Sequence, residues 1–286
     1  MRIAKKSAFV FALPGILIYF VFMVVPILLC FYYSFTNWDG ISDHYRFNGI
    51  KNFTELASDD TFLDALKYTA IFTLITALIY NVFGILIAVI LDKKSKVHNF
   101  AKSTVFLPVV LSSVVVSFIW SYMTQMDGGI INLVVNAFGL PSIHFYGSKM
   151  AILYTVSVAV TWAGLGYFTM VYMAALKTIP EELYEASTID GAGKTSKFFR
   201  ITLPLLAPGI TINTVLSIVW GFKQYDHMKI MTPGTVQSIT MNSIERAFNY
   251  NMFSYASAII LVLFVIVIVI SVIQLGIMKR FEVSEG

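Results

Sequence analysis

Charge is scarce in this chain. Only 13% of its 286 residues are Asp, Glu, Lys or Arg, whereas 57% are hydrophobic. A typical soluble domain is about 25% charged, so the composition excludes an ordinary water-soluble protein. Cysteine is nearly absent as well. Cys30 stands alone, which excludes an intrachain disulfide framework and a thiolate metal site.

Six long stretches lack ionisable residues altogether. No Asp, Glu, Lys, Arg or His occurs in residues 7–38, 68–91, 103–126, 150–176, 201–222 and 247–278. Each stretch is at least as long as the roughly 20 residues with which a helix crosses about 30 Å of hydrocarbon. We predict an all-α membrane protein in which six transmembrane helices form one domain, residues 1–286. The first stretch is far longer than the apolar part of a signal peptide, about 7–15 residues, so we expect an uncleaved span.

The basic residues predict the orientation. If the N-terminus is cytoplasmic, the inner segments hold 13 of the 20 Lys and Arg residues. The short inner segment 92–102 is especially rich in lysine. The positive-inside rule therefore predicts that both the N- and C-termini are cytoplasmic. We attribute the net charge of +4 to this topology. Membrane lipid is an expected partner, and nucleic acid is not.

The predicted spans also lack the groups that would drive transport or catalysis. No ionisable side chain lies at membrane depth, which argues against proton coupling, although backbone carbonyls could still bind sodium. The spans contain no Asp pair and the chain has no H-E-x-x-H motif, so we expect no catalytic residue and no metal site. The longest loop, 39–67, is too short for a domain with its own core, and we expect only a short surface helix around 61–66 in it. Any ATPase or receptor must be another chain.

One motif, GAGKT at residues 191–195, resembles a phosphate-binding loop at first sight. That loop needs an early glycine in G-x-x-x-x-G-K-[ST] and a preceding strand. Thr188 occupies the early position, and no strand is predicted before it. Thr178 and Glu181 instead predict a capping box that opens a helix over 179–190, which Gly191 ends. We therefore expect no nucleotide and no cofactor in this chain.

Around this motif the chain resembles a known family. Its loop signature is E-A-A, three residues, Gly, nine residues and I-x-L-P, and the matching residues are Glu185, Ala186, Ser187, Gly191, Ile201, Leu203 and Pro204. Only the third alanine differs, as Ser187. This is the signature of the permease subunits of binding-protein-dependent ABC importers of type I. Further stretches resemble the carbohydrate-uptake branch and its larger maltose-type permease: LPGILIYFVFMVVPILLCFYYSFTNW, VFLPVVLSS and LKTIPEELYEASTIDGAG.

The resemblance implies a non-catalytic subunit of an ATP-driven sugar importer in a prokaryotic plasma membrane. Its expected partners are a second, similar permease, two ATP-binding cassette ATPases that bind ATP and magnesium, and an extracellular sugar-binding protein. The cytoplasmic loop 177–203 would couple the chain to an ATPase, with Glu185 facing a basic residue. The same scaffold could carry a polyol or glycerol phosphate, although a phosphorylated solute favours Arg or Lys at depth. A membrane anchor that transports nothing is the third alternative.

A candidate sugar site lies on the later spans. Sugar rings place C–H faces against aromatic rings, and their hydroxyls need neutral polar partners. Helical spacing puts four residues of the fifth span in one stripe: Asn213, Ser217, Trp220 and Gln224. The resemblance adds Ser113, Gly164 and Tyr167. Alternatives remain open for each: a serine bonded to its own helix, a glycine used for close packing, and a tryptophan at the membrane interface.

Overall fold

The chain is helical nearly throughout. The computed structural model describes residues 2–93, 95–232 and 234–278, with side chains from residue 11 onward. No strand occurs in these ranges, in agreement with the predicted all-α class. The chain forms two compact units. The first consists of Met1–Leu63 and Asn242–Val265, and the second of Asp64–Met241 and Ile266–Gly286.

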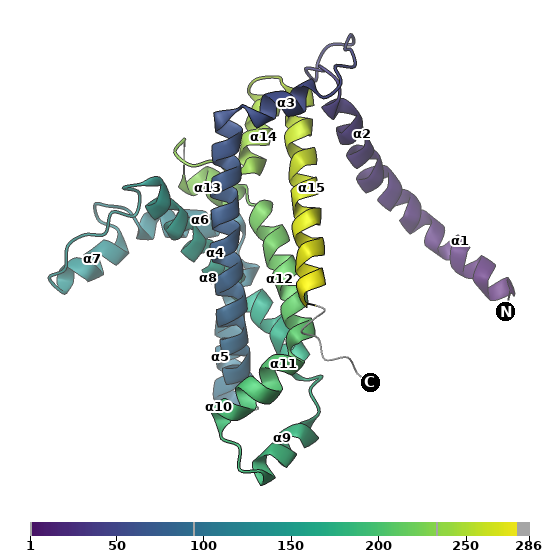
Figure 1. Ribbon diagram of the computed structural model, residues 1–286. Coiled ribbons are helices and arrows are strands. Elements are labelled where there is room, and N and C mark those ends of the chain that lie inside the picture. Colours follow the sequence, from purple (N-terminus) through teal and green to yellow (C-terminus); the bar gives the residue numbers. More distant parts are fainter. Residues whose placement is uncertain (1, 94, 233, 279–286) are drawn as a thin grey trace. The chain divides into compact units, whose positions relative to one another are not determined.

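Four helical segments are long and apolar enough to cross a membrane (Figure 1). The first is Phe11–Ser34, which includes most of α1 (Arg2–Tyr19) and all of α2 (Val25–Ser34). The other three are α4 (Asp60–Leu91), α8 (Lys149–Leu176) and α15 (Phe253–Met278). Two bent pairs raise the possible number to six. The described residues thus contain four to six candidate spans, and the predicted number of six is reached only if each bent pair is one span.

The third and fifth predicted spans are broken helices. In the third, α5 (Lys96–Phe106) runs through a 3₁₀ turn, Leu107–Val110, into α6 (Ser113–Met123) at 101°. The fifth joins α10 (Lys194–Lys197), a π-helical turn (Phe198–Thr202) and α11 (Leu203–Leu205) to α12 (Ala207–Phe222) at 66°. Pro108, Pro204 and Pro208 lie at these breaks, because proline cannot donate to a helical carbonyl.

Two π-helical turns have the same relation to proline. Phe20–Val24 ends two residues before Pro26, and Phe198–Thr202 ends two residues before Pro204. The proline ring excludes the usual hydrogen bond to the carbonyl four residues earlier, and a wider turn accommodates the lost bond. The helix therefore continues through these positions instead of ending there.

The expected short helix around 61–66 is wrong. Those residues belong to α4, and the short helix of this loop is α3 (Lys51–Ala57). Asp59 explains the early start of α4, since its Oδ1 accepts the backbone N–H groups of Thr61 at 2.9 Å and Phe62 at 3.3 Å. A carboxylate in this position satisfies the first donors of a helix. Charged residues thus form the N-terminal end of a helix whose middle is charge-free.

The first unit contains a polar cluster on Asp59. Its Oδ2 accepts hydrogen bonds from the Arg246 guanidinium at 2.8 Å and the Tyr255 hydroxyl at 2.6 Å. Arg246 lies on α14 (Ile239–Phe248) and also contacts the ring of Tyr250. Burial by itself raises the pKa of Asp59, but the bond from Tyr255 and the charge of Arg246 outweigh it and lower the pKa below its usual value.

This cluster predicts an acid-dependent stability. Because the folded-state pKa of Asp59 is lowered, the stabilisation is complete above the unfolded-state pKa of about 4 and is lost as pH falls through the folded-state pKa. At pH 7 the Asp59→Asn variant should be less stable by about 1–3 kcal/mol. Thermal unfolding of purified protein between pH 7 and pH 2.5 measures this. The gap between wild type and variant should close only below about pH 4. A gap that is constant with pH, or one equalled by exposed Asp43→Asn, contradicts the assignment.

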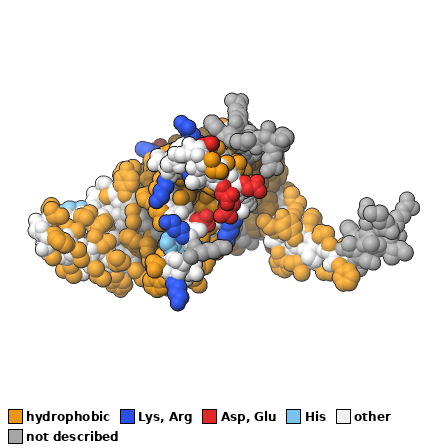
Figure 2. All heavy atoms as spheres, turned by 90° about the horizontal axis from the view of Figure 1, so that it is seen from below, with side chains coloured by type: hydrophobic (Ala, Val, Ile, Leu, Met, Phe, Trp, Pro, Cys, Tyr) orange, Lys and Arg blue, Asp and Glu red, His pale blue; other side chains and the backbone are white. Residues whose placement is uncertain are grey.

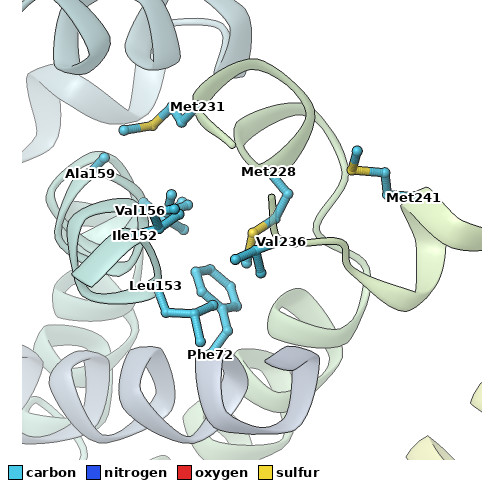
Figure 3. Packing of buried hydrophobic residues seen from close by; sticks show 10 residues of the cluster. Phe72, Ile152, Leu153, Val156, Ala159, Met228, Met231, Val236 and Met241 are labelled. Carbon is cyan, nitrogen blue, oxygen red and sulfur yellow. The ribbon is translucent and has the colours of Figure 1, made fainter. Parts of the chain in front are cut away.

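The second unit is built around α8. Its buried core joins Ile152, Leu153, Val156 and Ala159 of α8 to Phe72 of α4 (Figure 3). Methionines complete this core from α13 (Asp226–Met231) and α14: Met228, Met231 and Met241. Farther along α8, Tyr172 and Leu176 pack with Leu206. Consequently α8 is buried along most of its length and holds α4, α6, α12 and α13 in place.

Candidate translocation and coupling sites

An aromatic surface lies on α8 and α12 within the second unit. The ring of Trp220 stacks on that of Tyr167, with centroids 5.4 Å apart and planes at 19°. Phe168 meets Trp220 edge-on at 5.3 Å. Tyr167 and Trp220 remain 36% and 39% exposed, whereas Phe168 is buried. The two exposed rings offer an apolar face of the kind that a sugar ring covers.

The polar half of the predicted stripe points inward. Asn213 and Ser217 are fully buried. The Asn213 amide donates to the carbonyl of Phe168 at 3.0 Å, and the Ser217 hydroxyl donates to the carbonyl of Thr214 on its own helix at 2.9 Å. Asn213 Oδ1 has no partner among the described residues. Asn213 thus joins α12 to α8 by a hydrogen bond and retains one acceptor without a partner among the described residues. Ser217 is bonded to the backbone of its own helix, which is the alternative to a sugar contact.

Two further candidates contribute to packing and loop structure. A Cβ atom on Gly164 would collide with the Tyr80 hydroxyl, which donates to the carbonyl of Val160 at 2.9 Å. Gly164 therefore permits the close approach of α4 and α8. Gln224 lies beyond the end of α12, and its Oε1 faces Nδ1 of His227 at 3.1 Å. It is not on the helical stripe, because α12 ends at Phe222.

Ser113 begins α6 and contacts a residue that the sequence patterns missed. Its hydroxyl donates to Asp226 Oδ2 at 2.5 Å. Asp226 is the first residue of α13, 113 positions farther along the chain. The carboxylate lies at the N-terminal end of α6, where the helix dipole favours negative charge. The only sequence signal for Asp226 was an acidic residue soon after the fifth charge-free stretch.

The loop predicted to reach an ATPase contains the helix α9 (Glu181–Ile189). The predicted capping box is wrong, because the Thr178 hydroxyl donates to the carbonyl of Ala175 at 2.8 Å and Pro180 is the N-cap. Thr178 belongs to the turn that ends α8, so it cannot cap the next helix.

The end of α9 agrees with the prediction. Gly191 has φ +74°, and its N–H donates to Thr188 O at 3.1 Å while that of Ala192 donates to Ser187 O at 2.9 Å. This pair of bonds is a Schellman motif, which favours glycine in the left-handed position. The first glycine of GAGKT thus terminates a helix, and a helix, not a strand, precedes the motif.

Two side-chain contacts fix α9 against the segment that leads into α12. The Tyr184 hydroxyl lies 2.9 Å from Thr202 Oγ1, and the Lys197 ammonium donates to Thr188 Oγ1 at 2.6 Å. Ile201 and Leu203 pack against the buried core, while Pro204 follows in α11. The signature residues thus lie at both ends of a braced connection. Glu185, Ala186 and Ser187 are in α9, which Gly191 ends, and Ile201, Leu203 and Pro204 are in the segment that leads into α12.

The other face of α9 is open to solvent. Glu185 and Ala186 are exposed there, and Ile189 is 88% exposed. Figure 2 views the molecule from the end that carries α9 and shows acidic and basic side chains gathered there. The face of α9 that carries Glu185, Ala186 and Ile189 is therefore accessible to a partner.

Comparison with known proteins identifies the family. Residues 80–283 match the family of binding-protein-dependent transport system inner membrane components. The chain belongs to this family, and it is therefore a multi-pass membrane component of a transport system.

Relatives match over nearly the whole chain. A probable starch degradation products transport system permease protein, AmyD of Thermoanaerobacterium thermosulfurigenes, is 30% identical and covers 98% of this chain and 99% of its own. The multiple sugar-binding transport system permease protein MsmF of Streptococcus mutans is also 30% identical, over 98% of this chain and 97% of its own. A solved bacterial alginate ABC transporter in complex with an alginate pentasaccharide-bound periplasmic protein has a chain with TM-score 0.81 and 20% identity, covering 98% and 96%. At 20% identity, the alginate transporter supports the fold of this chain and nothing further.

Proposed function

We propose that this chain is the permease subunit of an ATP-driven importer that moves a sugar or oligosaccharide across the plasma membrane of a prokaryote. Family membership over residues 80–283 carries the proposal. Two relatives that match nearly end to end are named for the transport of starch degradation products and multiple sugars. In this proposal each bent pair is one span, so the chain has six transmembrane helices. An even number of spans places both termini on the same side, which is the cytoplasm by the positive-inside rule.

Energy enters through partners. The chain itself is non-catalytic and holds no cofactor, and two ATP-binding cassette subunits bind ATP and magnesium. The exposed face of α9 docks in a groove of one ATPase, as an amphipathic helix docks in a partner's groove. Because α9 is braced against the segment leading into α12, movement of the ATPase is transmitted to that helix. Residues Glu185, Ala186, Ser187, Gly191, Ile201, Leu203 and Pro204 form this coupling site.

The sugar passes the aromatic surface of α8 and α12. Tyr167 and Trp220 receive the C–H face of a sugar ring, and the buried Asn213 holds α12 against α8 beside them. Ser113, Gly164, Ser217 and Gln224 shape this region. An extracellular binding protein delivers the sugar, and a second permease completes the pathway. The six stretches predicted to cross the membrane contain no Lys or Arg that could pair with an anionic solute, and this supports a neutral solute.

The stacked pair provides the test of the sugar path. Trp220→Ala should raise the sugar-loaded receptor concentration for half-maximal uptake, or lower uptake, by about tenfold, because one apolar face is lost. Trp220→Phe should retain most activity. Radiolabelled sugar uptake into vesicles that contain the assembled importer measures this.

The control for this test lies on the same helix. Ile212, which is 53% exposed on α12, should tolerate alanine with a change below about twofold. Wild-type uptake by Trp220→Ala would remove the stacked pair from the sugar path. Failure of the wild-type importer to accumulate any sugar would reject the proposed function itself.

A further inference from the structure

A cavity of about 230 Å³ lies where the end of α4 meets α5 and α8. It belongs entirely to the second unit and is distinct from the aromatic surface and from α9. Five of its lining residues carry the argument: Lys102, Phe106, Thr169, Met170 and Met173.

One buried polar group in its wall lacks a partner. Thr169 is 2% exposed, and its hydroxyl makes no hydrogen bond to any residue that the structure describes. Thr155 and Thr161 of the same helix both donate to the carbonyl four residues earlier. A buried hydroxyl without a partner is costly. Thr169 thus places an unpaired hydroxyl in the wall of the cavity.

The cavity also carries a positive charge. The ammonium of Lys102 is 3.4 Å from the carbonyl of Lys93, a long hydrogen bond that leaves donors available. Within the described ranges no carboxylate pairs with Lys102. Lys102 therefore makes this part of the cavity wall positive. An anionic ligand fits this environment.

The rest of the wall is suited to hydrocarbon. Phe106, Met170 and Met173 line it, and methionine side chains adapt well to a flexible chain. The cavity lies at the end of α4, where the candidate span gives way to the polar segment 92–95. A ligand with one anionic end and one hydrocarbon end therefore matches both the lining and the depth.

We propose that this cavity binds an anionic phospholipid. Its phosphate pairs with Lys102, its acyl chain lies along Met170 and Met173, and an ester oxygen accepts from Thr169. Basic pockets between membrane helices bind such headgroups elsewhere. Assignment to the inner leaflet rests on the proposed topology, but binding does not depend on which solute is transported. The lipid would fill the joint between α5 and α8.

A photo-crosslinking experiment tests the site. The full chain, in its assembled importer, is placed in nanodiscs that contain a trace of phosphatidylglycerol with a diazirine in its acyl chain, and the labelled peptides are mapped by mass spectrometry. Labelling is expected on Phe106, Met170 or Met173. Lys102→Gln and Thr169→Val should each lower it about fivefold, and Lys102→Arg should retain it. Lys96→Gln, the same charge change outside the cavity, is the matched control and should retain labelling.

Competitors separate the possible ligands. Unlabelled phosphatidylglycerol should compete, whereas phosphatidylcholine and free glycerol phosphate should not. Equal labelling by a phosphatidylcholine probe, competition by glycerol phosphate, an equal loss in Lys96→Gln, or labels outside the cavity would each overturn the proposal. Because no readout involves uptake, an importer that fails to carry sugar but labels at this site would reject the proposed function and keep the lipid site.

Discussion

Replacing Gly166 with valine is expected to prevent stable folding, and alanine to weaken it. A Cβ atom on Gly166 would lie 2.5 Å from the carbonyl oxygen of Val105 and 2.8 Å from Cα of Phe106. Both are backbone atoms and cannot rotate away, so α8 must separate from α5. Overpacking of this kind costs about 1–3 kcal/mol or more. Alanine recovers at most about 1 kcal/mol of helix propensity, and valine adds two further clashing carbons.

Fluorescence-detected gel filtration of heated, detergent-solubilised protein measures the effect. The amount of monodisperse protein should fall in the order wild type, Gly166→Ala, Gly166→Val. Gly276 supplies the matched control, because it lies in α15 with no atom within 4 Å of its added Cβ. Gly276→Ala should be neutral or slightly stabilising. Equal thermal stability of Gly166→Val and wild type would show that the close approach of α5 and α8 is not required.

Much of the fold could be predicted because membranes impose a simple rule on helices. The stretch 150–176 predicts α8 within one residue, since Ser148 caps its start by accepting from the N–H of Ala151. The start of α4 could not be found in the same way. Absence of charge marks only the part in hydrocarbon, whereas α4 continues outward through Asp60, Asp64 and Lys67.

The breaks were predictable in position but not in angle. Pro108 marks the end of a helix, yet the 101° bend also requires Leu111 in an extended conformation with ψ 142°. That torsion depends on how α6 packs against α8 and α13, which no local pattern contains. The thirty-two-residue α4 and the broken third span therefore look alike in composition and differ in structure.

The candidate sites also contain some features that local sequence predicts and others that depend on contacts between distant segments. Gly191 was predictable because a left-handed residue after a helix favours glycine. Helical spacing placed Asn213 and Ser217 on one face with Trp220, but spacing cannot say which part of that face a neighbouring helix covers. The contact between Ser113 and Asp226 joins two distant segments, so neither residue carries a local signal for it.

Reversing the charge of Glu185 is expected to uncouple the importer without unfolding it. Glu185 is exposed, and α9 is secured by Tyr184, by Lys197 and by the turn at Gly191. The substitution therefore changes the surface and leaves the fold intact. Loss of one partner from an interfacial charge pair costs about 2–5 kcal/mol, and a like charge costs more. Receptor-stimulated sugar uptake by Glu185→Arg should fall by at least about thirtyfold.

The uncoupling has a direct biochemical readout. Co-purification of the ATPase with the tagged permease should drop with uptake, while the melting temperature of the permease stays within about 2 °C of wild type. Glu55→Arg is the matched control, because Glu55 is exposed in α3 and its ion pair among the described residues is with Lys51 at 3.6 Å, a contact worth about 0.3–0.5 kcal/mol. In the Glu185→Arg background, an acidic substitution of the basic ATPase residue that faces position 185 should restore uptake. The charge pair is then formed again with its signs exchanged. Normal uptake and ATPase retention by Glu185→Arg would place the coupling contact elsewhere than on α9.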